Sequence, residues 1–152
     1  MTVGPSLPAA YHALGFAINQ KLAAFDHTLT LVDEPDAQGR VPAMRRLTQA
    51  MDKGQVDTLI MLGGNPAYDA PANMNFAALL EKVPHTIHLS HDINETSALS
   101  QWHLPRAHAL ECWGDGRSWD GTLAVQQPLI LPLFDGRSPI ELLAMVLDQP
   151  RI

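Results

Sequence analysis

One run of residues, Thr58-Leu59-Ile60-Met61-Leu62, constrains the fold more than any other feature of this sequence. The run is apolar after its first residue, has the length of a β-strand, and ends at the turn signal Gly63-Gly64-Asn65-Pro66. A strand that lacks polar alternation is typical of a parallel sheet covered on both faces by helices. We therefore expect a parallel sheet rather than an open antiparallel one.

Strand-like and helix-like segments alternate along the rest of the chain. Further extended segments are expected at Thr28–Val32, Thr86–Leu89 and Trp102–Leu104. Helices are expected at about Pro8–Ala24, Pro42–Met51, Met74–Lys82, Glu95–Leu99 and after Ser138. This order predicts one α/β domain over residues 1–152, a three-layer, Rossmann-like fold with a mainly parallel sheet.

Apolar spacing and capping residues give each helix an expected buried side. The expected buried residues are Tyr11, Leu14, Gly15, Ile18 and Leu22; Met44, Leu47 and Met51; Phe76, Leu79 and Leu80; Ile140, Leu143, Ala144 and Leu147. Ser138-Pro139-Ile140-Glu141 has the pattern of a capping box, and Asn73 is a candidate N-cap. Between Pro105 and Pro132 the periodicity weakens, which predicts a long glycine- and tryptophan-containing loop with one strand at Leu123–Val125.

Charge and cysteine content exclude several classes of function. A net charge of −6 argues against electrostatic binding of nucleic acid or anionic lipid. No apolar run has the roughly 20 residues of a membrane span, and no secretory leader is expected, so a soluble chain is predicted with no address for a compartment. The single cysteine, Cys112, allows no internal disulfide, no iron–sulfur cluster and no Cys-x-x-Cys zinc site.

Polar residues gather at the carboxyl ends of two predicted strands, where open α/β sheets bind ligands. The first end carries Gly63, Gly64, Asn65 and Pro66, and the second carries Asp92, Glu95 and Thr96. Glycines allow another group to approach the backbone closely, and the amide of Asn65 is suited to a base or a ribose. A tight turn and a capped helix explain the same residues equally well, since neither a GxGxxG nor a phosphate-loop motif is present.

Metal and nucleophile chemistry receive weaker support. His85 and His88 lie on opposite faces of a strand, and a proline interrupts the segment that holds His103, His108 and Cys112, so no metal site is predicted. Neither Ser118 nor Ser138 lies in a nucleophile elbow, and no catalytic residue is assigned. The three tryptophans, Trp102, Trp113 and Trp119, indicate packing against a partner or against the sheet.

The ordered motifs resemble one α/β domain of the molybdopterin oxidoreductase superfamily. They are Gly63-Gly64-Asn65-Pro66, Glu95-Thr96-Ser97, Leu104-Pro105 and Glu111-Cys112-Trp113-Gly114. From about Gly4 to Leu147 the chain is most similar to the molybdopterin-oxidoreductase-like iron–sulfur subunit of alternative complex III, a family associated with membrane-bound quinol oxidation. The resemblance implies a piece of a longer protein, with family-equivalent cofactor positions at Gly63, Gly64, Asn65, Pro66, Asp92, Glu95, Thr96 and Glu111.

One departure from the family pattern bears on the cofactor. Cofactor-bearing relatives continue with a Gly-Thr-Phe-x-Asn-x-Glu-Arg segment that helps to hold molybdopterin guanine dinucleotide, whereas this chain has Gly121-Thr122-Leu123-Ala124-Val125-Gln126. The resemblance therefore implies a chain without cofactor, non-catalytic by itself, that is a scaffold for other domains or subunits of a membrane-associated redox complex and self-associates when isolated. Two alternatives are a small nucleotide- or pterin-dinucleotide-binding module, and a cofactor site that other domains complete.

Overall fold

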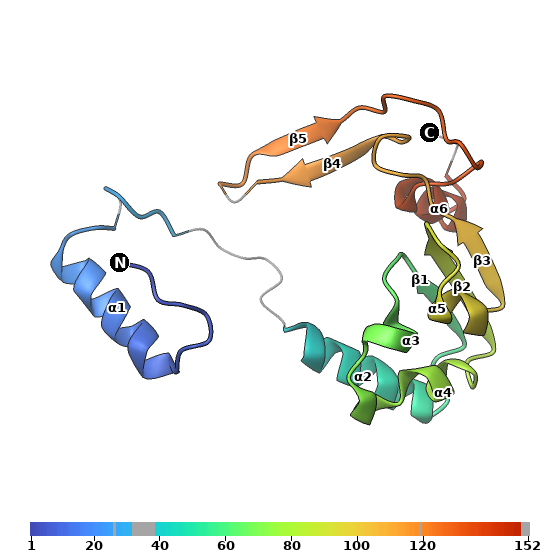
Figure 1. Cartoon of the computed structure of the whole chain (residues 1–152), viewed down its shortest axis with the longest axis horizontal. Coiled ribbons are helices and arrows are strands. Elements are labelled where there is room, and N and C mark those ends of the chain that lie inside the picture. The colour runs from blue at the N-terminus through green and yellow to red at the C-terminus, as the bar shows by residue number, and fades with distance from the viewer. Residues whose placement is uncertain (26, 32–38, 119, 150–152) are drawn as a thin grey trace. The chain divides into compact units, whose positions relative to one another are not determined.

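The computed structural model describes residues 1–25, 27–31, 39–118 and 120–149 (Figure 1). Contacts divide the chain into two compact units, one with residues 1–35 and 119–121 and the other with residues 36–118 and 122–152. Each unit is described by itself below. The single domain expected over residues 1–152 stays a prediction.

The first unit contains helix α1 (Ala9–Lys21), whose start agrees with the prediction but whose end comes before the predicted Ala24. The side chain of Asn19 is buried and binds both ends of Met1, accepting from its ammonium group at 2.7 Å and donating to its carbonyl at 2.8 Å. The expected buried stripe is wrong in part: Gly15 is buried and Ile18 is half-buried, but the three larger members are exposed, namely Tyr11, Leu14 and Leu22. A helix buries an apolar stripe only where another element covers it.

The strand predicted at Thr28–Val32 does not form over the residues that are described. Residues 28–31 contain one isolated bridge, from Leu29 to Phe25, and Val32 lies outside the described residues. The backbone N–H groups of Thr28 and Leu29 both donate to Ala24, at 2.9 Å each. The local turn therefore takes the hydrogen bonds that a neighbouring strand would have provided.

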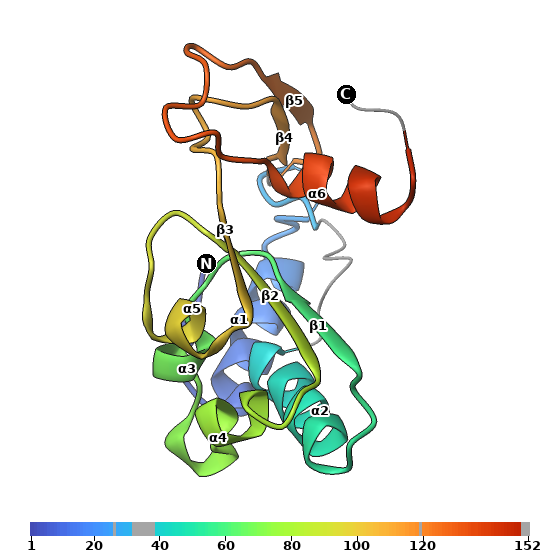
Figure 2. The same cartoon turned by 90° about the vertical axis from the view of Figure 1, so that its right-hand side faces the viewer.

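The second unit contains a parallel sheet with the strand order β1-β2-β3 (Figure 2). The strands are β1 (Thr58–Met61), β2 (His85–Ser90) and β3 (Trp102–Pro105). Helices α3 (Pro66–Asp69), η1 (Ala72–Met74) and α4 (Phe76–Leu80) join β1 to β2, and α5 (Glu95–Leu99) joins β2 to β3. The predicted α/β class with a parallel sheet is confirmed.

The core lies between this sheet and helices α2 (Arg40–Asp52) and α4. It contains Met51, Met61, Phe76, Leu79, Leu80 and Val83, with Met44 and Leu47 packed against it. Helical spacing predicts the members on α2 and α4, namely Met44, Leu47, Met51, Phe76, Leu79 and Leu80. Helix α4 is shorter than the predicted Met74–Lys82, and Asn73 does not cap it. Asn75 precedes α4 in the left-handed conformation (φ 47°), which separates the helix from the 3₁₀ turn before it.

Strand register shows which side chains share the helix-covered face of the sheet. Met61 is opposite His88, and His88 is opposite His103, so these three side chains point to one face. Helices α2, α4 and α5 contact this face through the core and through the hydrogen bond from α5 to His88. The opposite face carries Ile60, Ile87 and Trp102, of which Trp102 is 65% exposed.

The predicted loop from Pro105 to Pro132 instead contains a β-hairpin. Strand β4 (Gly114–Arg117) pairs antiparallel with β5 (Leu123–Gln126) as a separate two-stranded sheet. The strand at Leu123–Val125 is therefore confirmed, whereas β4 is missing from the prediction. The sequence of β4, Gly-Asp-Gly-Arg, has no β-branched or aromatic residue and so gives no local strand signal.

Helix α6 (Pro139–Val146) begins with the predicted capping box, because Ser138 accepts from the N–H of Glu141 while Glu141 accepts from the N–H of Ser138. The expected buried stripe is wrong: Leu142 is buried, Ala144 is half-buried, and the other members are exposed, namely Ile140, Leu143 and Leu147. The helix is thus covered on a different side from the one that its periodicity indicates. In the part of the chain that is described, no helix is long and apolar enough to cross a bilayer.

Candidate functional site

The turn after β1 brings the backbone close to other groups. Gly63 and Gly64 both have positive φ, 96° and 75°, a conformation that side chains with a Cβ rarely adopt. A Cβ on Gly63 would lie 2.6 Å from Nη1 of Arg106, so the guanidinium lies directly against this turn. Pro66 then opens the short helix α3. The positive φ is therefore what favours glycine here, and the Arg106 guanidinium occupies the space beside it.

Asn65 joins the two strand ends through three hydrogen bonds. Its Nδ2 donates to Oε2 of Glu95 at 2.6 Å. Its Oδ1 accepts from the N–H of Thr96 at 3.1 Å and from the hydroxyl of Thr96 at 2.8 Å. The hydroxyl oxygen of Thr96, which is fully buried, also accepts from the N–H of Ala67 at 2.9 Å. The predicted convergence of the β1 and β2 ends is therefore present, and these polar groups bind one another.

The buried side chain of His88 forms a hydrogen bond to the same turn. Its Nε2 lies 3.1 Å from the carbonyl oxygen of Gly64 and its Nδ1 lies 2.9 Å from Oγ of Ser97. A carbonyl only accepts, so Nε2 carries the proton and, in the neutral ring, Nδ1 accepts from the Ser97 hydroxyl. Burial lowers the pKa of His88, with the neighbouring His103 adding to the effect, which favours this neutral ring. His88 is a structural member of the site and is fully buried.

The loop after β2 is organised by helix capping. Oδ1 of Asn94 accepts from the N–H of Ser97 at 3.1 Å, which makes Asn94 the N-cap of α5. Asp92 is exposed, and its carbonyl oxygen lies 3.4 Å from Oγ of Ser97. Thus the helix-capping interpretation of this segment is confirmed for Asn94.

Two predicted carboxylates have different surroundings. The hydrogen bond from Asn65 lowers the pKa of Glu95. Glu111 lies elsewhere: its carboxylate accepts from the N–H of His108 at 2.8 Å and from the N–H of Leu133 at 3.2 Å, and these bonds lower its pKa. Glu111 therefore holds the base of the hairpin loop together and is not part of the Asn65 cluster.

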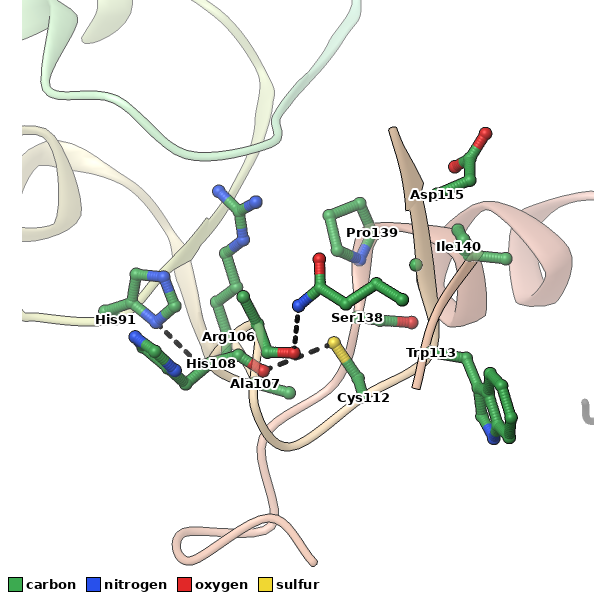
Figure 3. Close-up of a pocket in the computed structure, with 13 residues that line it drawn as sticks. His91, Arg106, Ala107, His108, Cys112, Trp113, Asp115, Ser138, Pro139 and Ile140 are labelled. Atoms are coloured by element: carbon green, nitrogen blue, oxygen red, sulfur yellow. Dashed lines mark hydrogen bonds between the residues drawn. The ribbon is translucent and has the colours of Figure 1, made fainter. Parts of the chain in front are cut away.

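A cavity of about 340 Å³ adjoins this region, in the second unit (Figure 3). Its lining includes Arg106, His91, His108, Cys112 and Asp115. Figure 3 shows the Arg106 side chain extending away from Cys112. Among the described residues, the Arg106 guanidinium forms no ion pair or hydrogen bond. Sequence reasoning missed Arg106, and its position directly after the Leu104-Pro105 motif is the only signal that could have found it.

The histidines and Cys112 in this cavity do not form a nucleophilic site. Nδ1 of His91 donates to the carbonyl of Arg106 at 3.1 Å, and Sγ of Cys112 donates to the carbonyl of His108 at 3.4 Å. Burial raises the pKa of the Cys112 thiol, so the reactive thiolate is disfavoured. Within the described residues, no three His, Cys, Asp or Glu side chains gather as a metal site.

The residues present fit a pterin dinucleotide poorly. Asn65 and Thr96 already use their polar groups on each other and on Glu95 and Ala67. Strand β5, Leu123–Gln126, carries no charged side chain. No protein-family profile matches this chain, and no curated protein matches it.

Proposed function

We propose that this chain is a non-catalytic α/β scaffold domain of an electron-transfer oxidoreductase assembly, of the kind that its motifs resemble in alternative complex III. The observation that carries the proposal is the bonding of Asn65 to Glu95 and Thr96. Residues at family-equivalent cofactor positions here hold two strand ends together. A polar group that already has good partners gains little from a ligand, because binding would exchange one hydrogen bond for another.

Exposed apolar side chains support the association with other domains or subunits. They occupy β5 and the segment that follows it: Leu123, Val125, Leu129, Ile130, Leu131, Leu133 and Phe134. Exposed apolar side chains that follow one another along a chain mark surfaces that another protein or domain covers. A scaffold domain needs such a surface, whereas an independent small enzyme does not.

Elemental analysis of the purified chain tests the absence of a cofactor. We expect no stoichiometric molybdenum or tungsten, and no pterin released on denaturation. The matched measurement is the unfolding free energy of Asn65→Ala, which should fall without any added ligand because the bonds to Thr96 and Glu95 are lost. Stoichiometric metal, or an Asn65→Ala variant as stable as the parent chain, would contradict the proposal.

A second function, a nucleotide-binding module, is favoured by one observation. The Arg106 guanidinium lies against Gly63, beside the cavity, and pairs with no carboxylate among the residues that are described. Guanidinium groups bind phosphates through paired, charge-assisted hydrogen bonds. A phosphate of a nucleotide would supply the partner that Arg106 lacks.

Thermal unfolding with guanine and adenine nucleotides distinguishes the two functions. If the chain binds a nucleotide, its midpoint should rise by several degrees, and Arg106→Met should abolish the rise while Arg45→Met, on the exposed side of α2, keeps it. If the scaffold proposal is right, no nucleotide changes the midpoint of either variant.

A further inference from the structure

The β4–β5 hairpin is a sheet with no further strand on either edge among the described residues. Within the described part of the chain, strands β4 and β5 pair with each other and with no third strand, and Asp115, Gly116 and Arg117 are all exposed. A two-stranded sheet is marginally stable alone, and an unpaired edge is a template for another strand. The edges of the hairpin therefore have unpaired backbone groups with which another strand could pair.

The hydrogen-bond pattern shows which peptide groups point outward from β4. The N–H of Ser118 donates to the carbonyl of Thr122 at 2.9 Å, which continues the ladder by one pair beyond Arg117 and Leu123. Hydrogen-bonded and non-hydrogen-bonded pairs alternate in an antiparallel ladder. Gly116 is thus bonded to Ala124, and the peptide groups of Asp115 and Arg117 point to the free edge.

The same two residues carry opposite charges on one face of the hairpin. Asp115 lies across from Val125, and Arg117 lies across from Leu123. Neither charged side chain forms an ion pair within the described part of the chain. If two copies of Asp115-Gly116-Arg117 run antiparallel with their glycines opposite each other, each aspartate therefore faces an arginine.

We propose that a second copy of this chain pairs with the free edge of β4, antiparallel, about a two-fold axis through Gly116. Asp115 then lies opposite Arg117 of the second copy, and Arg117 lies opposite its Asp115. Both pairs are of the type in which two residues exchange backbone hydrogen bonds, which are the groups that the free edge offers. This inference does not depend on the proposed function.

Charge selects this register over its neighbours. Axes through Asp115 or Arg117 would place like charges directly opposite each other, which is destabilising. The axis through Gly116 instead forms two ion pairs between the copies. In each pair, the arginine lies beside Leu123 of its own copy and the aspartate lies beside Val125 of its own copy. Leu123 and Val125 are 72% and 77% exposed in the single chain. Gly116 meets no obstacle, since a Cβ built there has no atom within 4 Å.

Charge reversal tests the proposal in the whole chain by sedimentation velocity over a range of concentrations. The parent chain should form a dimer. Asp115→Arg and Arg117→Asp, each alone, should weaken the dimer by about tenfold or more, because each creates two like-charge contacts. The double variant Asp115→Arg/Arg117→Asp should restore the dimer, because both pairs are rebuilt with the charges exchanged.

Two control variants make the same changes in net charge elsewhere. Glu81→Arg matches Asp115→Arg, and Lys53→Asp matches Arg117→Asp; both residues are exposed ends of helices in the same unit. We expect both controls to dimerise like the parent chain. A monomeric parent chain, single reversals that dimerise normally, or a double variant that stays monomeric would each overturn the proposal.

Disulfide trapping then locates the axis. In a Cys112→Ser background, Gly116→Cys should cross-link two copies on mild oxidation. The facing Cα atoms of a non-hydrogen-bonded pair are about 4.5 Å apart, inside the range that a disulfide spans. Ala124→Cys, at the equivalent place on β5, should not cross-link. If Ala124→Cys cross-links and Gly116→Cys does not, the copies pair along β5 and the proposal is wrong.

Discussion

The parallel sheet and the hairpin of the second unit bury their apolar residues in different ways. Leu80, between α4 and the sheet, is 1% exposed, whereas Leu131, after β5, is 85% exposed. On the helix-covered face of the sheet, apolar side chains are buried within the chain, and buried polar groups such as Thr96 and His88 have hydrogen-bond partners. Among the residues that the structure describes, the apolar side chains of β5 and of the segment after it are exposed. The two regions therefore differ in how much of their apolar surface this chain covers, and the exposed surface of the hairpin is the one that we propose a partner covers.

Removing one core side chain and one exposed side chain tests this contrast most directly. Leu80→Ala should lower the free energy of unfolding by about 2–5 kcal/mol, because it leaves a cavity in the core. Leu131→Ala should change it by less than about 0.5 kcal/mol. Urea unfolding at low protein concentration measures both. Equal losses would show that the segment after β5 is packed as firmly as the core.

Loss of the hydrogen bonds that Asn65 forms between the two strand ends should have the next largest effect on the free energy of unfolding. Asn65→Ala leaves Thr96 and Glu95 without their shared partner and should cost about 1–3 kcal/mol. Asn73→Ala is the matched control, since Asn73 is exposed and does not cap α4. If both variants lose the same free energy of unfolding, the hydrogen bonds of Asn65 do not stabilise the two strand ends.

Acidification should weaken the sheet region through His88. The pKa of His88 is lowered in the folded chain, whereas the unfolded ring titrates near 6.5. Between these two pKa values the unfolded chain binds a proton that the folded chain does not. The free energy of unfolding is therefore highest above pH 6.5 and falls as the pH drops below that value. The free energy of unfolding should fall by at most about 1.4 kcal/mol per pH unit. His88→Gln should remove this dependence and His85→Gln, at an exposed position, should keep it.

The smallest effect is expected at the start of α6. Ser138→Ala removes the acceptor for the N–H of Glu141 and should cost about 1 kcal/mol, while Ser138→Asp, which keeps an acceptor, should recover most of it. Chemical unfolding of both variants provides the measurement. If the aspartate variant is no more stable than the alanine variant, the loss does not come from the cap.

Elements with strong local signals were predictable from the sequence. The apolar run before Gly63 became β1, and the Ser138 capping box starts α6 as expected. Strand β4 was not predictable, because Gly-Asp-Gly-Arg has no strand propensity and becomes a strand only by pairing with β5. Likewise Arg106 has no motif of its own, and its place against Gly63 depends on the packing of β3 beside β2.

The sequence by itself determined the alternation of α2, β1, α4, β2, α5 and β3, the starts of α1 and α6, and the polar character of the two strand ends, because these follow from short-range periodicity and capping. The tertiary structure alone decided that Asn65 binds Thr96 and Glu95, that His88 is enclosed, and which sides of α1 and α6 are covered. Those outcomes depend on contacts between residues about 30 positions apart, and the energies of such contacts are not encoded in any local pattern.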